Sequence, residues 1–279
     1  MSAIAAFSQS LAKLLPNLGS VYFSRLLIET VRSLVPVDEV TIIVYETASL
    51  PFFDFADPNA WNQPNLDTFL KSAFLLDPYY IAATRENKSG FFRLRDLAPA
   101  GFRRSEYYRI YYGKSGLHDE CGYLIPIQGG GFINISLGRT SMSAFSKPQL
   151  LLLKDIAPLI TVLCRMHWQP KRQGESSETN LRGQLETALG CFGASVLTKR
   201  ERQVTNLILH GHTTKKLAEV LEISPETVKL HRKHAYAKLD IRTQSELFYL
   251  FIDSLMSIDG YDSGDPLIAY SQTPHKPAV

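Results

Sequence analysis

The segment over 224–238 carries four cationic side chains at helical spacing. They are Lys229, Arg232, Lys233 and Lys238. Only Glu226 opposes them in sign, and it follows Ser224 and Pro225, which supply a helix N-cap and a proline for the first helical position. Guanidinium and ammonium groups form strong hydrogen bonds with carboxylates and phosphates. The spacing therefore predicts a basic helix whose chemistry is the recognition of an anion.

Two shorter helices are expected just before this basic helix. Thr198 stands before a charged first turn, as an N-cap does, and Gly211 supplies the left-handed residue that ends the first helix. Thr213 or Thr214 caps the second helix, which runs to Leu221 before the chain turns. Two helices joined by a tight turn, with cations on the later one, form the arrangement that enters the major groove of duplex DNA.

The whole segment from Leu197 to Leu247 resembles the helix-turn-helix domain of the LuxR/NarL family of bacterial transcription regulators. The resemblance rests on an LTxRE opening, Gly211, the SPxTVKxH run over 224–231, and Lys238 with the leucine after it. It covers roughly the last quarter of the chain. The alternative is an ordinary helical bundle with a charged, solvated face.

The resemblance implies that some of these residues contact DNA bases and others contact the phosphates. Lys229 and Lys233 are expected to read base edges by donating to guanine O6 and N7, while Leu230 packs beside them in the groove. The expected phosphate contacts are Thr214, Lys215, Ser224, Thr227 and His231. Arg232 completes the predicted DNA-binding set.

Composition indicates a globular, soluble chain of two domains. It has 279 residues, of which 45% are hydrophobic and 20% charged. Residues 197–257 hold ten Lys or Arg against seven Asp or Glu, so a nucleic-acid role is expected of the C-terminal domain alone. No run reaches the length of a transmembrane helix and no basic leader is present, which predicts a cytoplasmic protein.

The three cysteines, Cys121, Cys164 and Cys191, are odd in number and lack metal-binding spacing. Reduced, mostly buried thiols are the simplest interpretation. A redox switch at Cys121 is the alternative, which the neighbouring Asp119 and Glu120 would oppose.

The N-terminal part predicts a sheet flanked by helices. Helices are expected over 3–15, 19–35, 66–75 and 107–112 and from Ser146 onward, and strands over 40–45, 52–55, 121–127 and 132–137. This order indicates an α/β sandwich of the GAF or PAS kind, and it resembles the N-terminal sensor domain of LuxR regulators, including Asp77-Pro78 and Phe92. Acyl-homoserine-lactone receptors carry a Trp and a Tyr shortly before the Asp-Pro pair. Residues 64–68 read PNLDT here, so the resemblance does not extend to a lactone ligand.

The predicted fold class is α+β. An N-terminal α/β/α sandwich sensor domain is expected over 1–168, a linker over 169–190, an all-α four-helix LuxR-type helix-turn-helix domain over 191–257, and a disordered tail over 258–279.

These elements predict a ligand-responsive transcription regulator, in which a small molecule bound by the sandwich changes how two DNA-binding domains are placed. The expected ligand is a compact amine or an amide-bearing metabolite held by an aromatic cage with an acid. The candidate residues are Tyr45, Trp61, Asp77, Tyr79, Phe92, Tyr107, Tyr111 and Glu120. Ordinary core packing of these tyrosines is the bland alternative. The alternative function is a regulator whose N-terminal domain binds a protein partner or only dimerises, without a small-molecule ligand.

A homodimer is expected, because two-fold symmetry would pair two recognition helices with two half-sites. Its predicted seam is the 247–255 stripe, our name for Leu247, Leu250, Phe251 and Leu255, which repeat at helical spacing. The alternative is that this stripe only closes the domain core. RNA polymerase is a further candidate partner.

No enzymatic activity, metal or cofactor is expected. Gly113-Lys114-Ser115 matches the end of a phosphate-binding loop, but Tyr108 stands where that loop needs a glycine. No GxSxG or HExxH motif occurs. A phosphoacceptor receiver domain would begin with a strand that ends in paired acids, whereas this chain begins with helices.

Overall fold

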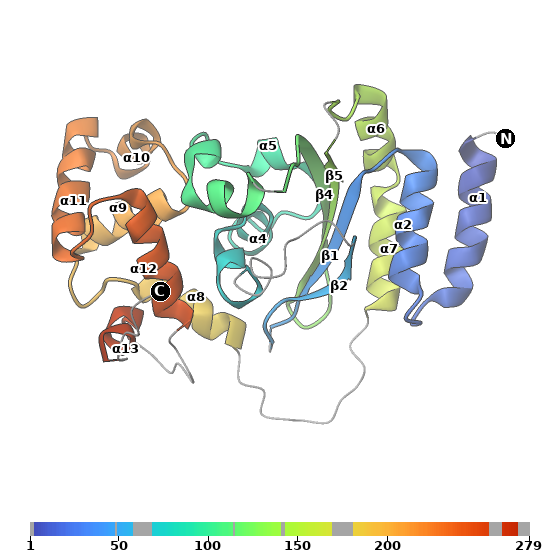
Figure 1. Cartoon of the computed structure of the whole chain (residues 1–279). Helices are drawn as coiled ribbons and strands as arrows, with labels where there is room; N and C mark the ends of the chain where they lie inside the picture. The colour runs from blue at the N-terminus through green and yellow to red at the C-terminus, as the bar shows by residue number, and fades with distance from the viewer. Residues whose placement is uncertain are drawn as a thin grey trace. The chain divides into compact units, whose positions relative to one another are not determined.

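The computed structural model describes residues 3–47, 49–57, 69–113, 115–140, 143–168, 181–256 and 264–272 (Figure 1). The chain divides into two compact units. The first comprises 1–66, 78–97 and 115–179, and the second comprises 67–77, 98–114 and 180–279. The two short segments 67–77 and 98–114, which the sequence analysis assigned to the sensor domain, thus group with the C-terminal helices.

The first unit is built on a five-stranded antiparallel sheet in the order β2-β1-β5-β4-β3. The strands are β1 (Glu39–Tyr45), β2 (Phe52–Ala56), β3 (Gly90–Arg93), β4 (Asp119–Pro126) and β5 (Phe132–Arg139). β4 and β5 form the predicted hairpin across a glycine turn, in which Gly129 and Gly130 adopt positive φ. Strands β1, β4 and β5 are buried on both faces, so they read as dense apolar runs.

Helices cover both faces of this sheet (Figure 1). One face packs on α2 (Phe23–Leu34), α6 (Lys147–Asp155) and α7 (Ala157–His167). Helix α1 (Ala3–Leu14) packs on the outside of α2, and the short η1 (Leu15–Asn17) lies between these two helices in the chain (Figure 1). The other face meets α4 (Pro78–Thr84) and α5 (Leu94–Leu97). Ser146 caps α6 through a capping box with Gln149. The predicted α/β/α sandwich is confirmed.

The register places Tyr45, Phe92, Glu120 and Asn134 on the face that meets α4. Tyr45 is fully buried and stacks on Phe132 of the neighbouring strand with ring centroids 4.4 Å apart. Side chains on this face are therefore interior groups rather than solvated ones.

The described residues of the second unit form helices and the turns that join them, without a strand. Its N-terminal pieces are η2 (Ala73–Leu76), η3 (Phe102–Arg104) and the π-helix η4 (Tyr108–Tyr112). Its C-terminal helices are α8 (Leu181–Cys191), α9 (Lys199–Leu209), α10 (Thr214–Leu221), α11 (Pro225–Lys238), α12 (Gln244–Met256) and α13 (Pro266–Gln272). The predicted helix over 107–112 is present with a wider hydrogen-bonding pattern, in which the Gly113 N–H bonds the Tyr108 carbonyl.

Two boundaries differ from those expected. The linker was placed over 169–190, but residues from Leu181 form α8, where Ala188 and Leu189 are buried. The tail was expected to be disordered, but α13 contacts α8 and α12. Asp265, which is 7% exposed, accepts hydrogen bonds from the Gly193 N–H at 2.9 Å and the Ser195 N–H at 2.7 Å. This buried carboxylate makes a long-range contact, so local composition does not reveal it.

Candidate nucleic-acid interface

Three successive helices, α9, α10 and α11, form the predicted helix-turn-helix, and each begins at the residue type that the sequence indicates. Thr198 and Glu201 make a reciprocal capping box at α9. Thr213 caps α10 by accepting from the Lys216 N–H at 3.2 Å. Ser224 caps α11 by accepting from the Thr227 N–H at 3.1 Å. These local bonds fix where each helix starts.

The turns between these helices depend on left-handed residues. Gly211 has a φ of +79° and ends α9, as predicted. Glu222 has a φ of +55° and ends α10, where a glycine would be the commoner residue. Only two residues separate this position from the first residue of α11, so α11 follows α10 after a tight turn.

Helix α11 is apolar on its buried side and cationic on its exposed side. Val228 is 2% exposed and Ala235 is fully buried, and they face α9 and α10. Lys229 and Lys233 are exposed on the outer side, and Leu230 is 50% exposed beside them. Neither lysine makes an ion pair with another described residue, so both ammonium groups are available to an anionic partner.

Four of the predicted phosphate-contact residues, Thr214, Lys215, Ser224 and Thr227, lie at the N-terminal ends of α10 and α11, whereas His231 lies in the middle of α11. Lys215 and Arg232 are exposed, while Thr214, Thr227 and His231 are partly exposed. Ser224 is exposed, and its hydroxyl bonds that of Thr227 at 2.9 Å while capping α11. Helix N-termini attract phosphates through free N–H groups and the helix dipole.

Lys238 does not belong to this cationic face. The sequence analysis grouped it with the anion-binding residues, but its Nζ bonds Glu201 Oε2 at 2.7 Å. The Glu201 side chain is 5% exposed and that of Lys238 is 39% exposed, so this ion pair, which joins α11 to α9, is buried only on its carboxylate side. Burial raises the pKa of Glu201, but hydrogen bonds from Lys238 and Thr198 outweigh that effect and hold the pKa below its ordinary value of 4.5.

Glu201→Gln is expected to lower the free energy of unfolding by about 1–3 kcal/mol at pH 7, because the amide keeps a capping oxygen but loses the charge that pairs with Lys238. A depressed carboxyl pKa adds stability above about pH 4.5 and loses it as the pH falls through the lower folded-state pKa. The difference between wild type and variant, measured by urea denaturation, should therefore shrink towards acidic pH. A pH-independent difference would contradict a role for the charge, and Glu219→Gln, in an exposed ion pair, is the control.

The described residues of the predicted ligand set are divided between the two units. Tyr45, Tyr79, Phe92 and Glu120 belong to the first unit, where only Phe92 is not buried. Asp77, Tyr107 and Tyr111 belong to the second, where the Tyr107 hydroxyl donates to Asp77 Oδ2 at 2.5 Å. Tyr111 packs on Tyr107, Phe69 and Phe248, which explains why burial raises its pKa. Trp61 lies outside the described residues.

Asn134 on β5 is a polar residue that the sequence analysis missed. It is 3% exposed, and its Oδ1 has no hydrogen-bond partner among the described residues. The alternating pattern over 132–137 signals a polar position here, but α4 covers that face, so the position is interior.

The thiols are buried, as expected, at Cys121 and Cys164, and burial raises the pKa of both. Acidic Glu120 and Asp119 raise that of Cys121 further. Cys191 is partly exposed. None of the helices in the described ranges has the length and apolar character needed to cross a membrane.

The structure places an α/β/α sandwich before a helix-turn-helix, which is the layout of a transcription regulator with a sensor-like N-terminal domain. The model of the family described as bacterial regulatory proteins, luxR family, matches residues 195–251. A protein of Aeromonas salmonicida described as a putative HTH-type transcriptional regulator in the exeN 3' region is 34% identical over 188 residues, 65% of this chain and 95% of that protein. The chain therefore belongs to the LuxR family of bacterial regulatory proteins.

Two further comparisons cover one part of the chain each. The nitrate/nitrite response regulator protein NarP of Escherichia coli strain K12 is 40% identical over 66 residues, 22% of this chain and 31% of NarP. The crystal structure of the VqsR LBD domain from Pseudomonas aeruginosa superposes with a TM-score of 0.52 and 27% identity over 59% of this chain and 99% of that domain.

Proposed function

We propose that this regulator binds duplex DNA by placing α11 in the major groove. The exposed row of Lys229, Leu230 and Lys233, opposite the buried Val228 and Ala235, is the observation that carries the proposal. The two ammonium groups have no ion-pair partners among the described residues, so they can donate to guanine O6 and N7. The apolar Leu230 side chain suits a neighbouring thymine methyl group. The N-terminal ends of α10 and α11 add hydroxyl, ammonium and backbone donors for the flanking phosphates.

Selection of genomic DNA fragments by the purified full chain tests this proposal. Enrichment of a shared motif, with a half-site of a few base pairs, is the expected result, since one recognition helix contacts only a few bases. Equal recovery of all fragments would contradict sequence-specific binding. The enriched sites would also identify the regulated genes.

We further propose that the sandwich binds a small ligand at the sheet face beneath α4. A buried polar atom without a hydrogen bond costs about 1–3 kcal/mol, and Asn134 Oδ1 is such an atom among the described residues. Its acceptor character favours a ligand that donates a hydrogen bond, such as a compact amide or amine. The similarity to a domain named LBD supports this proposal.

Thermal shift of the full chain with a panel of amines, amides and neutral isosteres tests the ligand. Asn134→Leu removes the acceptor at similar volume, and Ser136→Ala, two residues along the same face of β5, is a matched control. The expected result is a stabilising compound whose effect is lost in Asn134→Leu and kept in Ser136→Ala. If no compound stabilises the protein and Asn134→Leu alone raises its melting temperature, the small-ligand proposal is contradicted, and a sandwich that binds a protein partner or only dimerises becomes the favoured alternative.

A homodimer remains our proposal, but its predicted seam changes. Leu247, Phe251 and Leu255 of the 247–255 stripe are buried within the chain, where Phe251 packs edge-on against Phe192, so these three are core residues. Leu250 is only partly buried, and Tyr249 beside it is 50% exposed.

Leu250→Glu is expected to give a folded monomer, because it places a charge at the one stripe position that the chain does not bury. Sedimentation reports the mass and circular dichroism the helicity. Loss of helicity would show that Leu250 is also core, whereas an unchanged dimer would place the interface elsewhere. Phe251→Leu serves as the core comparison, with lowered stability and an unchanged mass expected.

A further inference from the structure

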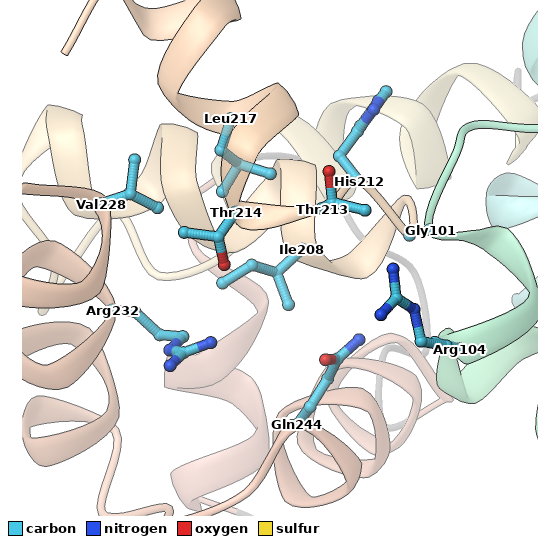
Figure 2. Close-up of a pocket in the computed structure, with 11 residues that line it drawn as sticks. Gly101, Arg104, Ile208, His212, Thr213, Thr214, Leu217, Val228, Arg232 and Gln244 are labelled. Carbon is cyan, nitrogen blue, oxygen red and sulfur yellow. The ribbon is translucent and has the colours of Figure 1, made fainter. Parts of the chain in front are cut away.

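A cavity of about 210 Å³ lies within the second unit beside the N-terminus of α10 (Figure 2). Its walls come from the segment 101–104, from the α9–α10 turn, from α11 and from the start of α12. The volume is far more than a single water requires, so the cavity can admit a small ligand.

The polar groups of this cavity are donors that converge from different segments. Figure 2 shows the guanidiniums of Arg104 and Arg232 on opposite sides of the cavity. The Gln244 amide lies between them, below the apolar side chain of Ile208, and the Thr214 hydroxyl lies above Arg232. No acidic side chain stands among the described residues of the lining. Within the described residues neither guanidinium makes an ion pair or a side-chain hydrogen bond. Two like charges on one cavity repel each other, and an anion between them removes that repulsion.

The nearby histidine does not alter this balance of charge. Burial, and then the charge of Lys216, lowers the pKa of His212 below its ordinary value of 6.5, so its ring is mainly neutral at pH 7. In Figure 2 that ring points away from the centre of the cavity. The two arginines therefore carry the positive charge.

The wall that holds Arg104 is fixed by close backbone packing. A Cβ on Gly101 would lie 2.1 Å from the Gly211 carbonyl oxygen, so only glycine permits this approach. The buried Ser105 hydroxyl donates to the Phe102 carbonyl at 2.6 Å and ties the same segment together. Arg104 thus extends from an anchored backbone.

We propose that this cavity is a binding site for a phosphate-type oxyanion, held between Arg104 and Arg232 with Thr214 and Gln244 as further donors. Guanidinium pairs recognise such groups through charge-assisted hydrogen bonds, and the N-terminus of α10 adds its dipole. The regulatory consequence rests on the proposed function: Arg232 and Thr214 are predicted DNA contacts, so a free anion that engages them competes with the DNA backbone.

Binding of inorganic phosphate to the full chain, against chloride at matched ionic strength, tests the site. Calorimetry should show saturable binding in wild type that weakens about tenfold or more in Arg104→Gln and Arg232→Gln, the loss expected for one charge-assisted partner. Arg103→Gln is the matched control, because Arg103 is exposed like Arg104 but does not line the cavity. Phosphate also stabilises proteins by exclusion from their surfaces, but that effect acts alike on all four proteins. Equal responses in the four, or no saturation in wild type, would overturn the proposal.

A second arm separates a free anion from a phosphate of the DNA backbone. If the anion is a free effector, Arg104→Gln weakens phosphate binding, but the DNA affinity measured without phosphate stays unchanged. Added phosphate then weakens DNA binding by the wild type and not by Arg104→Gln. If Arg104→Gln weakens DNA binding as much as Arg232→Gln does, the oxyanion belongs to the DNA and the free-effector form is overturned. Saturable phosphate binding by a protein that binds no DNA would support the anion site and contradict only the proposed function.

Discussion

Lys233→Ala is expected to lose most of the preference of the protein for its own site over random duplex. A lysine that donates to guanine O6 and N7 contributes about 1–3 kcal/mol of discrimination, and every 1.4 kcal/mol is about tenfold. Its ammonium group is exposed on the outer side of α11 and makes no ion pair with a described residue. Lys229→Ala should behave in the same way. Fluorescence anisotropy on the selected site and on a scrambled duplex measures both affinities.

The salt dependence of the same titrations separates base readers from phosphate contacts. Lys215→Ala should weaken binding to both duplexes about equally and reduce the salt slope by about one. Lys199→Ala, an exposed lysine at the start of α9, is the control and should change neither quantity. An equal loss on both duplexes for Lys233→Ala would make Lys233 a phosphate contact and end its assignment as a base reader.

Asp265→Ala is expected to destabilise the C-terminal helices by about 2–4 kcal/mol, because a buried carboxylate that accepts several hydrogen bonds is removed. The Gly193 N–H at 2.9 Å and the Ser195 N–H at 2.7 Å would lose their acceptor, and so would the Leu267 N–H at the start of α13. Urea denaturation reports the stability, and hydrogen exchange at Gly193 and Ser195 reports the local contact.

Glu219→Ala is the matched control for that measurement. Its carboxylate pairs with Lys216 at 3.3 Å on an exposed surface, where an ion pair adds little stability. If Asp265→Ala unfolds at the same urea concentration as this control, the hydrogen bonds of Asp265 do not contribute to the stability of the domain. Faster exchange at Gly193 without a change in stability would confine the role of Asp265 to ordering the loop before α9.

The helix starts of the DNA-binding segment could be predicted because their causes are local. Thr198, Ser224 and Gly211 act on backbone groups within a few residues of themselves, so their types and spacing are sufficient evidence. The strands were predictable for a similar reason, since β-branched and aromatic runs such as residues 40–45 suit a buried sheet.

The errors came from contacts between residues far apart in the chain. Lys238 looked like part of the anion-binding face until Glu201, 37 residues earlier, was found beside it. Asn134 was not singled out, because a polar residue in an alternating strand is typical of a solvated face, whereas α4 covers that side of the sheet. Helical spacing alone cannot tell whether the 247–255 stripe faces a second subunit or the core, and only Leu250 is left partly outside. Arg104 carried no local signal at all, because its cavity needs three other segments.

The bond between Asp265 and Gly193 also affects the order in which the protein can complete its fold during synthesis. Domains form as units while the chain emerges from the ribosome, N-terminal parts first. The loop before α9 obtains its acceptor only from a residue 72 positions later. The helix-turn-helix can therefore assemble its three helices early, while the loop ahead of them lacks its acceptor until Asp265 has emerged from the ribosome. A stalled nascent chain that has exposed α12 but not Asp265 outside the ribosome should be cleaved by protease near Gly193, and one that has also exposed α13 should resist.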